Sequence, residues 1–177
     1  SPNGVATEQP ESKSILDRNQ ETDIRVVTWN VLHPFCPSST TIPEYASHAS
    51  VLKALAPDVI VFNEMTCQNG YLATWLSDEV RDGAWQVHHG LETGHRTVIA
   101  SYWPMTMAEV DTQPPGAWEY PDGKLFRGVT LALIDCPDLY WSTDLYLMGV
   151  HLKAYECDQC EAMRQLSADA IANWLGD

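Results

Sequence analysis

Basic residues are scarce in this chain. Its 177 residues include 10 Lys and Arg against 24 Asp and Glu, which gives a formal net charge of −14 at pH 7. This balance opposes tight, sequence-independent binding to duplex DNA, because such binding rests on neutralising phosphates with Lys and Arg. It does not exclude a phosphodiesterase, since a bound divalent cation reverses the local charge. Solubility, or a salty milieu, explains the acidic excess without reference to any substrate.

Long apolar runs are also missing. No stretch approaches the roughly 20 residues that a helix needs to span a bilayer, so we expect no transmembrane segment. A hydrophobic content of 45% with seven Trp is typical of a globular protein. The length predicts one domain with an ample core. Residues 1–23 are polar and without periodicity, which predicts a flexible leader before a domain at 24–177.

Cysteine is present in an odd number, and a second Cys or His pair that would complete a zinc site is not evident. The five are Cys36, Cys67, Cys136, Cys157 and Cys160. The Cys157-x-x-Cys160 spacing is compatible with a redox pair, half a zinc site or a local disulfide. We favour a structural disulfide in an exported protein, secreted or periplasmic, with buried free thiols as the alternative. No signal peptide is visible.

Two apolar, strand-like runs end in polar residues whose side chains could bind a ligand or take part in catalysis. The first ends at Asn30 and the second at Glu64, and a helical pattern over 44–56 separates them. A third run, 145–150, ends just before His151. We expect the three strands to share one sheet and their polar ends to meet at one edge, where ligand sites form in α/β sheets. A carboxylate and an amide there are suitable oxygen ligands for Mg²⁺.

Five runs along the chain carry a family resemblance. They are RVVTWNVL (25–32), PDVIVFNEM (57–65), RTVIASYWPM (96–105), FRGVTLALI (126–134) and LYLMGVHLKAY (145–155). In order and spacing they resemble the endonuclease/exonuclease/phosphatase superfamily, whose members include DNase I-like and sphingomyelinase-like enzymes. The closing MRQL (163–166) resembles the Arg/Gln helix that usually follows the histidine strand. The resemblance implies an α/β fold: a mixed β-sheet with flanking helices, half of a two-sheet α/β sandwich.

The chain departs from this family's pattern in its second half. The family's Gly-Asp-x-Asn strand end, a further Asp and a terminal Asp-His pair have no counterpart. Gly176-Asp177 either begins the first of these motifs or, as we favour, caps the preceding helix. We therefore expect residues 24–177 to be the N-terminal half of the fold, apparently truncated, with a missing C-terminal half as its partner.

The resemblance gives the candidate site residues their roles. Glu64 is the expected metal ligand, against the alternative of a solvated strand-end carboxylate. Asn30 helps to hold the metal or phosphate, unless it only satisfies its own turn. His151 binds phosphate or protonates the leaving group, for which an unperturbed pKa of about 6.5 is suitable; a structural His is the alternative. Arg127 resembles a phosphate-contacting Arg, with a surface ion pair equally compatible.

Other residues are weaker candidates. Arg96 is a second possible phosphate contact, and Arg164-Gln165 resembles the family's helix pair but also fits a solvent-facing pair. The aromatic groups Tyr102-Trp103 and 118–120 suit stacking on a base or a lipid headgroup. Aromatic loops are more often packed, so we assign them no role at this point.

The function implied is a Mg²⁺-dependent (or Mn²⁺-dependent) phosphodiesterase or phosphatase. Its substrate would be a phosphate ester: nucleic acid, phospholipid or nucleotide. As given, the chain would be weak or inactive, because the second-half ligands are absent. The alternative is a non-catalytic binding module that keeps the fold without the chemistry.

Overall fold

The structure is a computed structural model, and it describes residues 16–32, 45–65, 69–90, 96–107, 130–152 and 156–176. Arg127 and the aromatic group at 118–120 lie outside these ranges. Every predicted strand within them is present, and the fold is mixed α/β. Its seven strands form two sheets, one of four strands and one of three.

Sheet A has the order β1-β2-β4-β3. Its strands are β1 (Val26–Asn30), β2 (Val59–Met65), β3 (Gln86–His89) and β4 (Arg96–Ser101). β1 and β2 run parallel and in register from Val26↔Val59 to Asn30↔Asn63, as expected for two runs separated by one helix. β2 and β4, the inner strands, are the most apolar, because both their faces are covered.

Two helical segments follow the predicted amphipathic patterns. α1 (Ala46–Leu55) buries Ala49 and Leu52 and ends where Ala56 turns left-handed, just before Pro57. α2 (Asn69–Trp75) continues as a π-helical segment, η2 (Leu76–Val80). Together these elements form the first apolar core with one face of sheet A. Its members include Leu52, Phe62, Leu72, Trp75 and Trp85.

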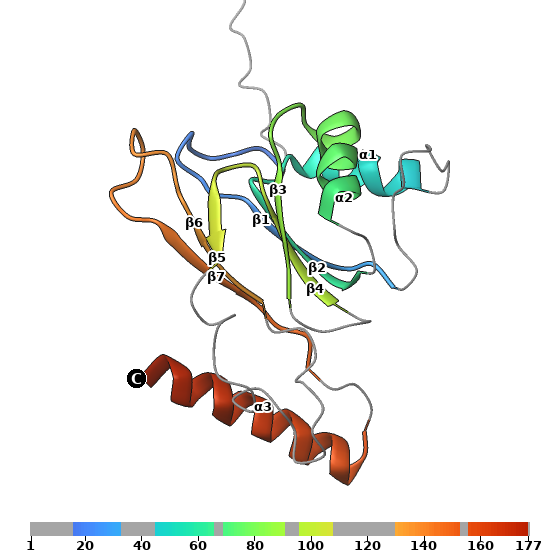
Figure 1. Ribbon diagram of the computed structural model, residues 1–177. Helices are drawn as coiled ribbons and strands as arrows, with labels where there is room; N and C mark the ends of the chain where they lie inside the picture. Colours follow the sequence, from blue (N-terminus) through green and yellow to red (C-terminus); the bar gives the residue numbers. More distant parts are fainter. Residues whose placement is uncertain are drawn as a thin grey trace, which may run out of the picture.

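Sheet B is antiparallel, in the order β5-β6-β7. Its strands are β5 (Met105–Met107), β6 (Thr130–Ile134) and β7 (Leu145–Gly149). Its inner face forms the second core with the opposite face of sheet A, through Val59, Val61, Ile99, Ala132, Ile134 and Cys136. The two sheets lie beside each other in Figure 1, with α1 and α2 on the far side of sheet A.

One expectation about the sheets is wrong. The strand that leads to His151, β7, belongs to sheet B and not to the sheet of Asn30 and Glu64. The reason is local: β7 follows β6 after a short connection, and consecutive strands usually pair with each other. Apolar patterning reveals a strand but not the sheet it joins.

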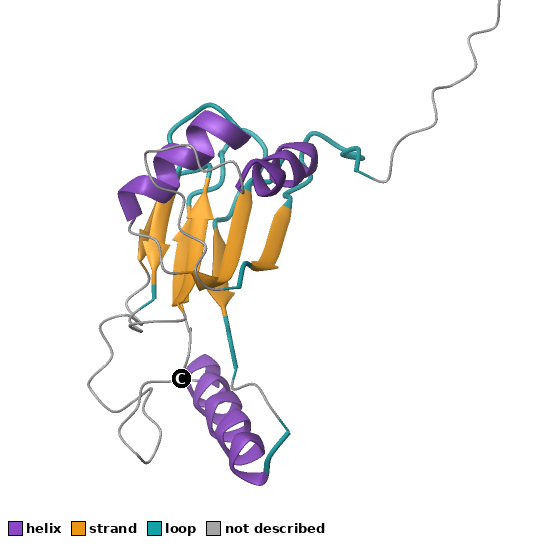
Figure 2. Cartoon of the chain, turned by 90° about the vertical axis from the view of Figure 1, so that its right-hand side faces the viewer, coloured by secondary structure: helices purple, strands orange, loops and turns teal. Residues whose placement is uncertain are grey.

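The last helix, α3 (Asp158–Gly176), lies apart from both sheets in the two views. Figure 2 shows it beyond the end of the strands, below the part of the fold that holds the other helices. Among its apolar residues, Met163 and Ala170 are half-buried and Leu166 is 42% exposed. No helix in the described ranges has the length and apolar character that crossing a membrane requires.

Candidate functional site

The ends of β1 and β2 bring the first two predicted residues into contact. The Asn30 side chain donates from Nδ2 to Oε1 of Glu64 at 3.0 Å. Its own Oδ1 accepts the backbone N–H of Leu32 at 3.0 Å. With the amide in this orientation, Asn30 positions the Glu64 carboxylate, and its oxygen would have to leave Leu32 to bind a cation.

Glu64 owes its direction to an irregularity in β2. The β2–β4 register shifts between Phe62 and Met65, and Glu64 has a φ of 62°, in the left-handed region. Such a bulge inserts an extra residue and re-aims side chains. Here Phe62 and Met65 both join the core beneath the helices, although regular alternation would place them on opposite faces. Glu64 is thereby released from that core.

His151 approaches the same carboxylate from sheet B. Its Nε2 lies 3.4 Å from Oε1 of Glu64, and the two side chains are 14% and 19% exposed. The site is therefore built across the two sheets rather than along one edge, and its side chains converge even though the strands do not share a sheet.

Gly149 makes this approach possible. A Cβ at this position would lie 2.6 Å from Cγ2 of Thr97 and 2.9 Å from Cγ1 of Val61, both in sheet A. Only a residue without a side chain lets the end of β7 come this close. His151 follows two residues later, so the close contact of the sheets sets its distance to Glu64.

A buried hydrogen-bonded chain lies behind the bulge. Thr97 donates from Oγ1 to Oδ1 of Asn63 at 3.0 Å, and its carbonyl accepts Oγ1 of Thr130 at 2.8 Å. Thr97 and Thr130 are fully buried. These bonds connect β2 at the bulge with β4 and then with β6 of sheet B. Because buried polar groups need such partners, this series of hydrogen bonds fixes Asn63, the residue next to Glu64.

Sequence reasoning missed Asn63, Thr97 and Gly149. The signals were weak: a polar residue at the end of an apolar run, a Thr within a strand and a Gly before a polar strand end. Each acquires its role only from the way the two sheets pack.

The remaining candidates do not join this cluster within the described residues. Arg127 lies outside them, and so does the side chain of Arg96, whose backbone begins β4. On α3, Arg164 pairs with Oε2 of Glu161 at 2.5 Å, and Gln165 donates to Asp169 at 2.8 Å.

The donor set fits a weakly held Mg²⁺. Across the residues that the structure describes, no group of three or more His, Cys, Asp or Glu side chains could hold a metal. Mg²⁺ usually keeps several waters and is bound through one or two carboxylates together with substrate phosphates, and Glu64 would supply one such carboxylate to this site. It is not a closed, high-affinity site.

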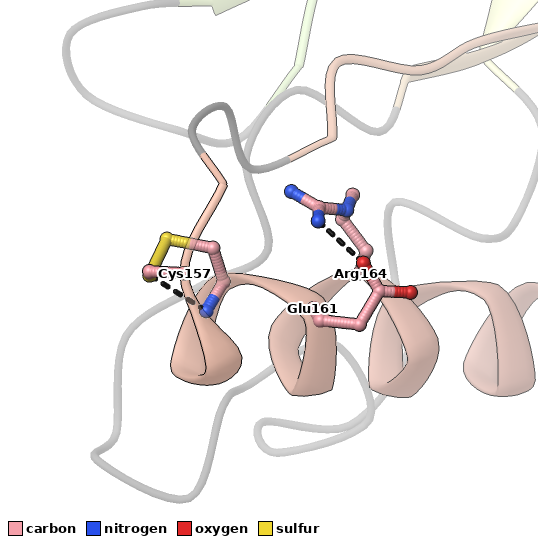
Figure 3. The surroundings of a disulfide bond; sticks show 4 residues. Cys157, Glu161 and Arg164 are labelled. Carbon is pink, nitrogen blue, oxygen red and sulfur yellow. Dashed lines mark hydrogen bonds and ion pairs between the residues drawn. A yellow bond between two sulfur atoms is a disulfide. The ribbon is translucent and has the colours of Figure 1, made fainter.

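The predicted disulfide is present. Cys157 and Cys160 are bonded, with their Cα atoms 5.0 Å apart, at the start of α3. The backbone N–H of Cys160 also donates to Sγ of Cys157 at 3.0 Å, as a helix-capping contact would. Figure 3 shows this first turn with the Glu161–Arg164 pair one turn further along. The bridge stabilises the beginning of the helix and lies away from Glu64 in the sequence.

Comparison with known proteins supports the fold. No family model matches the chain, and no curated protein matches it in sequence. A solved structure does: an endonuclease/exonuclease/phosphatase from Beutenbergia cavernae DSM 12333, with a TM-score of 0.51 and 20% sequence identity. The match covers 82% of this chain and 43% of that one. The chain thus has the fold of somewhat less than half of an endonuclease/exonuclease/phosphatase structure, as its motifs predict.

Proposed function

We propose that this chain carries part of the active site of a divalent-metal-dependent phosphodiester or phosphomonoester hydrolase. The observation that supports this most is the meeting of Asn30, Glu64 and His151, which come from three strands in two sheets. A strained backbone at the central carboxylate is also typical of functional sites.

In this proposal each residue has a separate task. Glu64 holds the divalent cation, and Asn30 keeps the carboxylate in place through its N–H bond. His151 faces the same carboxylate and exchanges a proton with the leaving group or contacts phosphate. A cation at Glu64 would polarise a phosphoryl oxygen and stabilise the charge that develops there. Arg127 is proposed as a further phosphate contact.

The alternative, a binding module without catalysis, is favoured by the small number of ligands. Glu64 is the one carboxylate of the candidate site, and the described residues include no group of three or more His, Cys, Asp or Glu side chains that could hold a metal. We rank it second because a binding module has no need of a left-handed Glu held against an Asn and a His. An oxidising compartment, secreted or periplasmic, is part of the proposal and is motivated by the Cys157–Cys160 bond.

Metal titration of the wild type and of Glu64→Gln tests the proposal. We expect weak Mg²⁺ and Mn²⁺ binding by calorimetry that disappears in Glu64→Gln, because an amide lacks the charge. Glu161→Gln, at a carboxylate on α3 that is 71% exposed, is the matched control and should bind as the wild type does. Identical titrations of wild type and Glu64→Gln would falsify the assignment.

Hydrolysis of a diester and a monoester of p-nitrophenol, with Mg²⁺ or with EDTA, tests the reaction itself. Turnover by residues 1–177 should be slow and should vanish in EDTA. His151→Ala should lower it by about 10²–10⁴-fold while leaving metal binding intact. Absence of metal-dependent turnover would favour the binding module, turnover that survives EDTA would contradict the metal dependence, and equal turnover in His151→Ala would contradict the role of His151.

A further inference from the structure

A cavity lies at the opposite end of β2 from Glu64. It has a volume of about 500 Å³ and is lined by Arg18, Asp58, Arg81, Trp103, Tyr140 and Trp141, among others. Asp58 directly precedes β2, so roughly 20 Å of strand separates this cavity from Glu64. Its size is within the range of small-molecule sites, about 300–1,000 Å³. The proposed hydrolase chemistry gives it no task.

The floor of the cavity is the carboxylate of Asp58, and both of its oxygens have partners within the chain. The side chain of Asp58 is 4% exposed, and its Oδ2 forms an ion pair with Nη2 of Arg18 at 2.8 Å and accepts the backbone N–H of Arg25 at 2.8 Å. Arg81 adds a longer contact from Nη1 at 3.3 Å. The two shorter contacts both reach Oδ2, so Nη1 of Arg81 serves Oδ1 of Asp58, and the argument for a ligand rests on the other N–H groups of that guanidinium.

Arg81 is held in a fixed orientation with donors to spare. Its guanidinium carbon lies 3.5 Å from the centroid of the Tyr102 ring. That ring is fixed in turn, because its hydroxyl donates to the carbonyl of Asp82 at 3.0 Å and Gly83 leaves room for it. A guanidinium has five N–H donors, and within the described residues Arg81 uses one of them in a hydrogen bond, from Nη1 to Oδ1 of Asp58. Its side chain is 39% exposed.

Aromatic rings line the rest of the cavity. Trp103 and Trp141 have ring centroids 5.2 Å apart, and Tyr140 contacts Trp141 at 5.5 Å. Tyr140 is 46% exposed, so its ring is within reach of a ligand. These residues come from the connections after β4 and after β6, which the packing of the two sheets brings together.

We propose that this cavity binds a flat ring that carries an anionic group, either a phosphate or a carboxylate. Rings stack on the aromatic wall, and the planar fork of Arg81 pairs with two oxygens of the anion. The pre-formed stack of Arg81 on Tyr102 lowers the entropy lost on binding. Glu21 also lines the cavity, but it is exposed, so water and salt screen its charge.

Calorimetry in EDTA tests the proposal without a cation at Glu64. The probes are adenosine monophosphate, benzoate, adenosine, benzyl alcohol and inorganic phosphate. We expect adenosine monophosphate or benzoate to bind at least about tenfold more tightly than its uncharged counterpart and than phosphate alone. If adenosine monophosphate binds and benzoate does not, the anionic group is a phosphate. If benzoate binds and adenosine monophosphate does not, it is a carboxylate. Equal binding of charged and uncharged rings, or no binding by any ring, overturns the proposal.

Variants separate this site from the hydrolase site. Arg81→Gln should weaken binding by at least about tenfold, and Arg164→Gln, at an Arg on α3, should leave it unchanged. Tyr140→Ser, at an exposed ring with little effect on folding, should also weaken it, and circular dichroism confirms that each variant is folded. Glu64→Gln should bind as the wild type does. Wild-type affinity in folded Arg81→Gln or in Tyr140→Ser refutes the assignment.

Discussion

Glu64 has a backbone conformation that costs a residue with a side chain about 1–3 kcal/mol. This strain is offset by the contacts of Glu64 with Asn30 and His151. The hydrogen bond from Thr97 to the neighbouring Asn63 also offsets it. The arrangement gives the carboxylate little freedom to turn. A group held in this way is ready to bind without first being ordered.

At Gly149 we predict a large effect from one methyl group. Gly149→Ala places a Cβ against Cγ2 of Thr97 and Cγ1 of Val61, on β-branched side chains that cannot easily rotate away. The sheets must separate, so the free energy of unfolding should fall by about 1–3 kcal/mol. The His151–Glu64 distance should also lengthen.

Urea unfolding measures the first effect and a crystal structure the second. Gly70→Ala is the control, because nothing lies within 4 Å of its added Cβ and Ala favours a helix by about 0.5–1 kcal/mol. It should be neutral or stabilising. Equal stability of Gly149→Ala and the wild type would show that the sheets adapt freely.

Cys136 should be an inert thiol in the folded protein. Burial raises its pKa, and the nearby carboxylates of Asp144 and Asp135 raise it further, while a backbone hydrogen bond from Leu145 partly opposes this. The folded pKa lies above the unfolded one, so unfolding releases a proton at alkaline pH. The stability contributed is present below the ordinary thiol pKa and is lost as the pH rises through the folded pKa.

Urea midpoints from neutral to alkaline pH measure this trend for Cys136. Cys136→Ala should remove part of the alkaline loss of stability, and iodoacetamide should label the wild-type thiol only after unfolding. Rapid labelling of Cys136 in the native protein would contradict its burial.

At the scale of elements, Thr97 connects the two sheets to the bulge in β2. Thr97→Val keeps the shape of the side chain but leaves Oδ1 of Asn63 without its donor, so stability should fall by about 1–2 kcal/mol. Metal binding at Glu64 should weaken as well, because the neighbouring residue is no longer fixed. Thr106→Val, at an exposed position in β5, is the control for both measurements. Unchanged metal affinity in a destabilised Thr97→Val would limit Thr97 to a structural role.

Prediction from sequence succeeds for these elements where the signal is local. The apolar runs and the helical pattern over 44–56 located β1, β2, β4, β6, β7 and α1 within a few residues. The bulge at Glu64 and the sheet to which β7 belongs depend on packing between distant segments. No local pattern encodes them, which is why the three polar ends were expected along one edge.

At the scale of the whole molecule, Asp58 fastens the segment before β1 to the rest of the fold. It joins Arg18, within the predicted leader, to Arg25 and to Arg81 after η2. Asp58→Ala leaves these donors without their acceptor. We expect a loss of about 2–3 kcal/mol, below the usual value for a fully buried pair because both arginines are partly exposed.

Thermal and urea unfolding measure this loss, with Asp78→Ala at an exposed carboxylate in η2 as the control. Protease should also cleave the segment around Arg18 more readily in Asp58→Ala. If both variants unfold alike, Asp58 does not anchor the segment.

The division into two sheets also sets an order of events during synthesis. All four strands of sheet A precede residue 102, so they leave the ribosome before β6 and β7 do. At about 5–20 residues per second, His151 follows Ser101 by roughly 3–10 s. During that interval Asn30 and Glu64 can already be in contact, while Val59, Val61 and Ile99 still face water. The growing chain therefore exposes an aggregation-prone apolar surface for seconds. The folding of sheet B then covers that surface and brings His151 to Glu64.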